Sequence, residues 1–219
     1  MQVTVQVTVQ VTVQVILLVA TAVTALANWW SRVRENDRIE TWTKPLTTLL
    51  VIGLALVSGA PASHITIAVV ALMLCLCGDV ALMPVIDKFV IGLACFLLGH
   101  LVFIALFVQY GMPDWWLGAG AGVLAAVLIA TAGRRIVAAA AAQDAALRIP
   151  VLAYLTVISS MAICGWATGQ PWVVAGTTLF VVSDALLGWR QFVSPHGWMG
   201  PAVMITYHGA IASLALSLW

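Results

Sequence analysis

Six long stretches without a charged residue constrain this chain more than any other feature. They contain no Asp, Glu, Lys or Arg, and together they cover most of the 219 residues. A spanning helix needs about 20 mostly apolar residues, and a soluble fold of this size could not bury so many of them. The chain is therefore predicted to be an integral membrane protein. The stretches are residues 1–31, 45–78, 89–113, 115–133, 149–183 and 191–219.

Composition agrees, since 63% of the residues are hydrophobic and 8% are charged, against roughly 25% charged in soluble domains. Breakers at "SGAPASH" and "TGQP" divide the longer stretches. The result is one all-α domain over residues 1–219, a bundle of about eight helices. A β-barrel is excluded because these runs are apolar on every face. The expected spans are 12–30, 45–59, 64–83, 88–108, 115–133, 149–168, 171–189 and 198–219.

The N-terminal repeat, three copies of VTVQ over residues 3–14, alternates like a half-buried strand. An isolated strand cannot cross lipid, because its backbone groups would stay unpaired. Counting back about 20 residues from the Trp29 and Trp30 anchor reaches the third copy, which should be helical. Residues 1–11 are a low-complexity extension whose first two copies are helical, extended or disordered.

Basic residues give the orientation. All nine fall in loops on one side of the eight spans, so the positive-inside rule puts those loops in the cytoplasm and both termini outside. The stretch "GRRIVAAAAAQDAALRIP" should continue the span 115–133 along the inner interface, where it could touch anionic lipid, although a plain connector is favoured. The net charge of +1 indicates no nucleic-acid partner.

Ionisable residues inside spans are the first candidates for function, because lipid makes them costly unless they pair or face a cavity. Asp79 and Asp184 lie about 7 and 8 Å inside the cytoplasmic ends of their spans. Lys44, with Pro45 in a first-turn position, opens its span from the same surface. These three side chains are expected to share one site. The alternative is structural pairing of each aspartate with Lys44, Lys88 or Arg190.

Deeper polar residues lie near the midplane: His100, Tyr207 and His208, about 15 to 18 Å from the inner helix ends. His100 belongs to a stripe of aromatic residues that would suit an acyl chain. Close helix packing through Gly92 and Gly99 is an equally good explanation of the stripe. The histidines would then simply form hydrogen bonds between helices.

The polar residues inside the spans do not match most of the known kinds of site in membrane proteins. A zinc hydrolase needs about three ligands, but only His100 and His208 lie at depth, so no metal is expected. The two histidines could ligate haem, but no residues of a second haem site or of a quinone site accompany them, so no cofactor is predicted. A serine hydrolase is disfavoured because no G-x-S-x-G is present.

Five segments in order resemble a known family. "TKPLTTLL", "CGDVALMP", "KFVIGLACFLLGHLVFIALF", "SDALLG" and "TYHGA" are similar to segments of the YhhN-type lysoplasmalogenases. The resemblance extends in order from the second span to the eighth and so over most of the chain. It implies hydrolysis of the vinyl-ether bond of lysoplasmalogens to a fatty aldehyde and a glycerophospho-base. The polar positions it implies are Lys44, Asp79, His100, Ser183, Asp184 and Tyr207, and His208 is added as a neighbouring candidate.

The chemistry of the residues agrees with that reaction. A vinyl ether is hydrolysed by protonation of its β-carbon, and two carboxyls can divide the work as in glycosidases, one donating the proton and one stabilising the cation. Asp79 and Asp184 are the expected catalytic pair. Lys44 would hold the phosphate of a lysophospholipid in the cytoplasmic leaflet of the cell membrane, while His100, Ser183, Tyr207 and His208 contact substrate.

Two other classes of protein remain open. One is a small transporter or lipid-binding protein whose Asp–Lys network gates a path, since transporters are often built from repeats. The other is a purely structural membrane protein. Membrane lipids are expected partners in every case, and the oligomeric state stays open.

Overall fold

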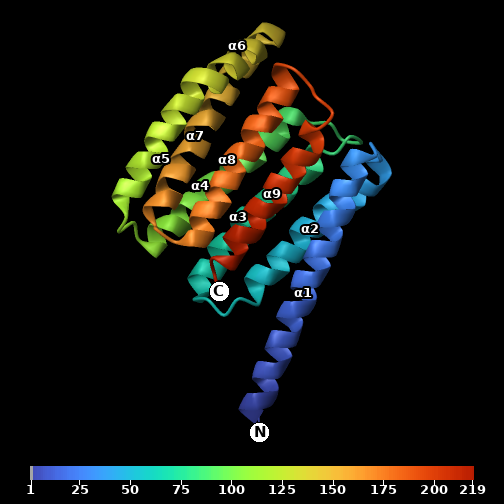
Figure 1. Ribbon diagram of the computed structural model, residues 1–219, viewed down its shortest axis with the longest axis vertical. Coiled ribbons are helices and arrows are strands. Elements are labelled where there is room, and N and C mark those ends of the chain that lie inside the picture. Colours follow the sequence, from blue (N-terminus) through green and yellow to red (C-terminus); the bar gives the residue numbers. More distant parts are fainter. Residues whose placement is uncertain (1) are drawn as a thin grey trace.

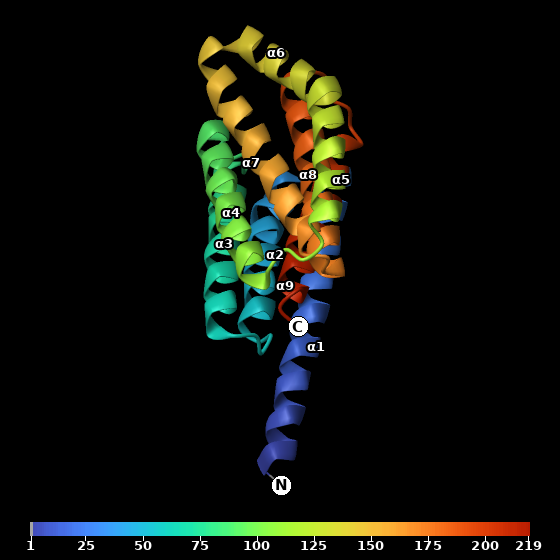
Figure 2. The ribbon, with the colours of Figure 1, turned by 90° about the vertical axis from the view of Figure 1, so that its left-hand side faces the viewer.

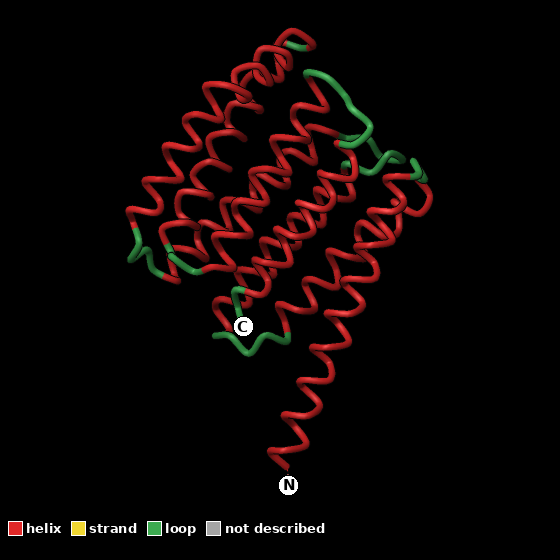
Figure 3. The backbone as a smooth tube through the Cα atoms, in the orientation of Figure 1, coloured by secondary structure: helices red, strands yellow, loops and turns green. Residues whose placement is uncertain are grey.

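The computed structural model describes residues 2–219, with side chains described from Thr8 onward, and within that range the chain forms only helices and loops (Figure 3). The helices pack into one bundle (Figure 1). They are α1 Gln2–Val33, α2 Asp37–Leu56, α3 Ala62–Ala81, α4 Phe89–Tyr110, α5 Trp115–Leu128, α6 Arg134–Gln143, α7 Arg148–Ala167, α8 Pro171–Phe192 and α9 Met199–Leu216, with a π-helical turn η1 Ile129–Gly133 and a 3₁₀ turn η2 Ala145–Leu147.

The predicted bundle of eight helices is confirmed, because α5, η1 and α6 run on without a break as one long helix. Seven of the eight are long and apolar enough to span a membrane. The exception is α2, whose first half carries Asp37, Arg38, Glu40 and Lys44. As expected, the segment after residue 133 continues its span, and Figure 2 shows α6 bending from the end of α5 toward α7.

Helix α2 differs from the expected span in a way that matters for the site. It begins at Asp37 rather than near Pro45, because Asn36 caps it by accepting a hydrogen bond from the Ile39 amide. Pro45 therefore lies inside the helix, and the prediction that it occupies a first turn is wrong. Lys44 does not open α2 at the membrane surface but lies more than one turn inside it, with an exposed fraction of 4%.

The N-terminal repeat is helical in all three copies, since α1 starts at Gln2. At about 1.5 Å per residue its 32 residues are about 48 Å long, against about 30 Å of bilayer hydrocarbon. Figure 1 accordingly shows the start of α1 projecting beyond the other helices. The third copy makes one contact with the bundle, because Gln14 donates to the carbonyl of Val57.

Both termini lie at one end of the bundle, and the loops that carry the basic residues lie at the other (Figure 1). This arrangement follows from an even number of antiparallel spans joined by short loops. The assignment of the basic end to the cytoplasm stays a prediction.

The first four helices, α1–α4, and the later helices, α5–α9, form two halves that meet through their last members, α4 and α9. Helix α3 packs closely on α4, and α8 packs closely on α9. Across the boundary, α4 packs on α7 of the second half while α9 packs on α2 of the first half. Close approach depends on glycines, as at Gly99, where a Cβ would lie 3.3 Å from the carbonyl of Ala71 on α3.

The aromatic stripe of α4 belongs to the core rather than to an open slot. Phe103, Phe107 and His100 are fully buried, and Gly92 and Gly99 bring α4 against the residues of α3. Of the two explanations for the stripe, helix packing is the one that holds for these residues. The space for a chain lies elsewhere, between α5, α7 and α8.

Candidate active site

Asp79 is the centre of a fully buried polar cluster that joins three helices. Its Oδ2 accepts a hydrogen bond from Thr48 Oγ1 of α2 at 2.6 Å and another from the Tyr207 hydroxyl of α9 at 2.7 Å. Its Oδ1 lies 3.6 Å from Lys44 Nζ. We call Lys44, Thr48, Asp79 and Tyr207 the Asp79 cluster. Here the carboxylate has a cation and two hydroxyl donors, so its charge is compensated inside the bundle.

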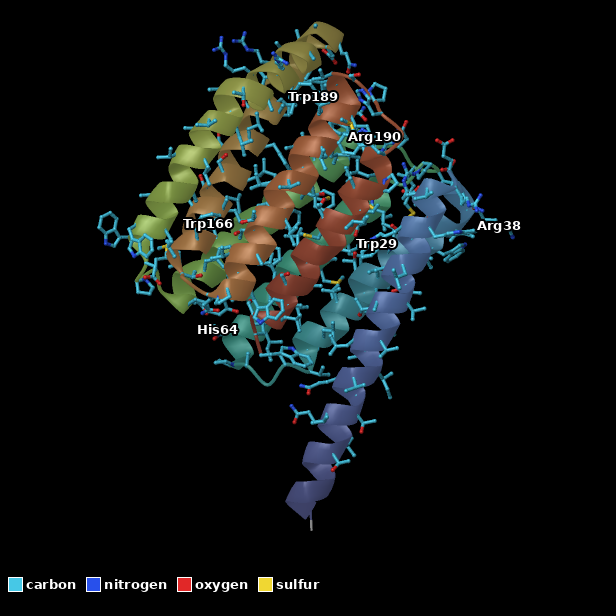
Figure 4. All side chains as sticks on the ribbon, in the orientation of Figure 1. Trp29, Arg38, His64, Trp166, Trp189 and Arg190 are labelled. Atoms are coloured by element: carbon cyan, nitrogen blue, oxygen red, sulfur yellow. The ribbon has the colours of Figure 1, made fainter. Side chains whose placement is uncertain are left out.

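His208 extends this region toward α1. Its Nδ1 accepts a hydrogen bond from the Trp29 indole at 3.1 Å, and its ring lies 5.6 Å from that of Tyr207. Figure 4 shows Trp29 directed from α1 into the bundle. His208 Nε2 is buried without a hydrogen-bond partner. The contact with Trp29 joins α1 to α9.

Asp184 is the centre of a second cluster, built on α4, α7 and α8. The Tyr154 hydroxyl donates to Asp184 Oδ2 at 2.5 Å. His100 Nε2 lies 3.9 Å from the same oxygen, too far for a hydrogen bond. We call His100, Tyr154 and Asp184 the Asp184 cluster. No lysine or arginine of the described chain forms an ion pair with Asp184.

His100 is the least satisfied polar group of this second cluster. It is fully buried, and neither ring nitrogen has a hydrogen-bond partner. Its ring packs edge-on against Phe180 at 4.6 Å and against Tyr154 at 5.5 Å between centroids. A buried imidazole costs free energy when it is left without a partner, so this position suits a bound polar group beside Asp184.

The expected single site is therefore two sites. Lys44 pairs with Asp79 and not with Asp184, and the phenyl ring of Phe180 packs between His100 and Tyr207. His100 and Tyr207, which are expected to lie deeper than the aspartates, each reach one of them with their side chains: Tyr207 donates a hydrogen bond to Asp79, and His100 lies 3.9 Å from Asp184. Their depth in the membrane stays a prediction.

An apolar groove leads to the Asp184 cluster. Helices α5 and α8 both pack on α7, and the space between them is a cavity of about 150 Å³. We call it the alkyl groove. Between Tyr154 and Trp166 of α7 it extends for about 18 Å. Its walls are mainly side chains of Ala, Leu, Ile and Val, among them Ala121, Ala125, Leu128, Ile158, Ala162 and Val182.

The two ends of the alkyl groove differ. One end holds Tyr154 and Asp184. At the other, Trp166 donates from its indole to Thr178 Oγ1 at 3.0 Å, and Figure 4 shows Trp166 on the part of α7 away from α6. The length of about 18 Å is comparable with one leaflet of the hydrocarbon core. A second, smaller cavity of about 40 Å³ reaches Asp184 from the side of Phe89 and Phe192.

Ser183 lies outside these two cavities, although the sequence suggested that it contacts substrate. Its buried hydroxyl donates to the carbonyl of Val203 at 3.2 Å and so joins α8 to α9. Asp79 and His208 also do not line either cavity. Of the expected residues, only Asp184 lines the alkyl groove, with His100 beside it.

Tyr154 and Thr48 were missed in the sequence. Each is the hydroxyl partner of one aspartate. The signal for Tyr154 was weak: it is one hydroxyl in the apolar segment "VLAYLTV", which lies outside the five segments that carry the family resemblance.

Metal ligation has little support in the described part of the chain. Within it, no three His, Cys, Asp or Glu side chains lie close enough together to hold an ion. The arrangement instead suits proton transfer, with a hydroxyl, an imidazole and a carboxyl meeting at the end of an apolar groove.

Fold and site together define a class: an all-helical, multi-pass membrane protein with a half-buried carboxyl at the end of an apolar groove. A model of the YhhN family matches residues 39–218. The chain therefore belongs to the YhhN family, as the sequence motifs suggested. Helix α1 lies outside the matched residues. Comparison with curated proteins and with solved structures gave no match.

Proposed function

We propose that this protein hydrolyses the vinyl-ether bond of a lysoplasmalogen, releasing a fatty aldehyde and a glycerophospho-base. One observation carries the proposal: Asp184, held by Tyr154 and adjoined by His100, stands at the end of an apolar groove about 18 Å long. In this proposal the hydrocarbon chain lies along the groove, and the bond to be cleaved is the first polar feature of such a lipid. The reaction would take place in the cytoplasmic leaflet, where the basic loops are expected.

In the proposed reaction Asp184 is the general acid. It transfers its proton to the β-carbon of the vinyl ether, which leaves an oxocarbenium ion beside the new carboxylate. An apolar setting without a paired cation favours the neutral acid that this step needs. The carboxylate then stabilises the cation, as in glycosidases.

Water completes the reaction. A water molecule attacks the carbon attached to the ether oxygen and gives its proton to Asp184, so the acid is restored. The hemiacetal then collapses as its hydroxyl proton passes to the ether oxygen, giving aldehyde and alcohol. The unpaired nitrogens of His100 are suited to hold that water next to the carboxylate.

The two aspartates have unequal roles in this proposal. Asp79 is neutralised by Lys44 and positions Tyr207, whose ring packs against Phe180. Phe180 in turn packs against His100. Ser183 and His208 act through packing between helices. The expected equal partnership of two carboxyls becomes one catalytic carboxyl and one positioning carboxyl.

The test is aldehyde release by the purified protein from an alkenyl lysophospholipid, with its acyl counterpart as a second substrate. Asp184→Asn keeps the shape of the side chain and removes the acid. Its rate should fall by about 100-fold to 10,000-fold, the usual contribution of general acid catalysis. Asp87→Asn, an exposed loop position, is the matched control. Wild-type rates in a folded Asp184→Asn protein would exclude the mechanism.

A transporter is the second candidate, favoured by the contacts between the two halves. Each half supplies one aspartate, Asp79 or Asp184, and that aspartate contacts the last helix of the other half, through Tyr207 or His100. Transporters are often built from two repeats. Uptake of unaltered lipid into sealed vesicles, without aldehyde, would favour this candidate.

A further inference from the structure

The surface beside the alkyl groove contains a third, differently built cavity. It lies between α6 and α7, has a volume of about 430 Å³, and is flanked by Arg134 at the start of α6 and Arg148 at the start of α7. Ile129, Gly133 and Leu155 line both this cavity and the alkyl groove. The two spaces are therefore neighbours that share a wall, and Asp184 lies in the inner one.

Arg134 and Arg148 are both exposed at the edge of this cavity. Within residues 8–219, neither Arg134 nor Arg148 has an ion-pair partner. Arg32 pairs with Glu40, and Lys44 pairs with Asp79. Two unpaired guanidinium groups at the edge of one groove form a site for a dianionic or monoanionic oxygen group, because each offers several N–H donors in a planar fork.

We propose that Arg134 and Arg148 bind the phosphate of a single-chain phospholipid whose hydrocarbon chain occupies the alkyl groove. This inference rests on the proposed function and deepens it, by naming the head-group subsite. The glycerol would pass over Gly133 and Leu155, which brings the ether bond to Asp184. Lys44 does not serve this purpose, because it is buried and its Nζ lies 3.6 Å from Asp79.

The geometry of the long helix supports this assignment. The π-helical turn η1 ends at Gly133, directly before Arg134, and π-helical turns occur frequently at functional sites. Beyond it α6 bends toward α7 (Figure 2). Arg134 follows this turn and lines the same cavity as Arg148, while Ile129 and Gly133 of the turn also line the alkyl groove. Arg135, the next residue, is directed elsewhere, with its guanidinium 6.0 Å from the centroid of Trp189.

The test measures binding of an acyl lysophospholipid, which has no vinyl ether to cleave, to purified protein in detergent. The double variant Arg134→Gln, Arg148→Gln should raise the dissociation constant at least about tenfold, as expected for lost hydrogen bonds to a charged group. Arg135→Gln, the control, should stay within about twofold. Equal binding by the double variant and the control would overturn the proposal.

Two further arms identify the ligand. An alkenylglycerol without phosphate should be cleaved at the same kcat/KM by the wild type and the double variant. A loss there would show a structural effect and overturn the assignment. Inorganic phosphate should not displace the lysolipid, because it lacks the chain; displacement at equal concentration would assign the site to free phosphate instead. Absence of aldehyde from the wild type would refute the proposed function, whereas the binding arm would still decide the subsite.

Discussion

The two aspartate clusters each pair an aspartate with a tyrosine but differ in the charge beside the carboxyl. Around Asp79, a lysine at 3.6 Å and two hydroxyl donors surround the carboxylate in the closed centre of the bundle, while its Oδ1 forms no hydrogen bond. Around Asp184, one tyrosine donates a hydrogen bond to the carboxyl, His100 lies 3.9 Å away without a hydrogen bond, and a groove opens beside it. We therefore expect the carboxylate that is paired with a cation to stabilise the bundle, and the carboxyl without a cation to be available for reaction.

The largest effect is expected from Asp79→Asn, which tests the difference between the two clusters. The change leaves the Lys44 ammonium buried without its counter-ion, which costs about 3–5 kcal/mol of stability. The melting temperature in detergent should fall strongly, whereas the rate per folded molecule should fall less than in Asp184→Asn. Asp184→Asn should melt close to the wild type, because no cation depends on its carboxylate.

A second substitution tests whether the loss of stability comes from the unpaired ammonium group of Lys44. Lys44→Met combined with Asp79→Asn removes both charges and should recover most of the lost stability. Should Asp79→Asn melt like the wild type, Asp79 would not be the compensated member, and the assignment of the two clusters would have to be reversed.

A matched pair of tyrosines sharpens the comparison. Tyr154→Phe removes the hydroxyl that donates to Asp184, and aldehyde release should fall about 10-fold to 100-fold because the acid loses its orientation. Tyr207→Phe removes one of two donors to Asp79 and should cost about 1.5–3 kcal/mol of stability, with a rate within about threefold of the wild type. The rate of aldehyde release and the melting temperature are measured for both variants. Equal losses of rate would mean that both clusters act in catalysis.

The helices of the bundle could be predicted from the sequence, but the side-chain contacts between them could not. Uncharged stretches and breakers are local features, so eight helices and the extension of α5 into α6 could be predicted from them. The start of α2 could not, because Asp37, Arg38 and Glu40 look like a solvated loop until the capping by Asn36 and the burial of Glu40 against Arg32 are seen. That error placed Lys44 at the surface.

The site itself depends on contacts between helices distant in the chain. Asp79 with Tyr207 and Asp184 with His100 join opposite halves, and no periodicity within one helix encodes which neighbour it meets. The groove was equally hidden, since Ala121 and Ala162 look like ordinary lipid-facing or packing residues. Intramembrane charge still selected Asp184 as a candidate, because its cost demands an explanation in any fold.

The smallest effect is expected at the N-terminus, where α1 projects beyond the other helices (Figure 1). Deletion of residues 2–9 removes the part of α1 that projects beyond the bundle and retains Gln14 with its bond to Val57 (Figure 1). Trp29, the contact of α1 with His208, is also retained. Aldehyde release should stay within about twofold of the full chain, since changes remote from packed sites are nearly neutral. Circular dichroism should show a loss of helix in proportion to the residues removed. A large fall in rate would mean that α1 reaches the Asp184 cluster through the Asp79 cluster, and the separation between stability and chemistry would then not hold.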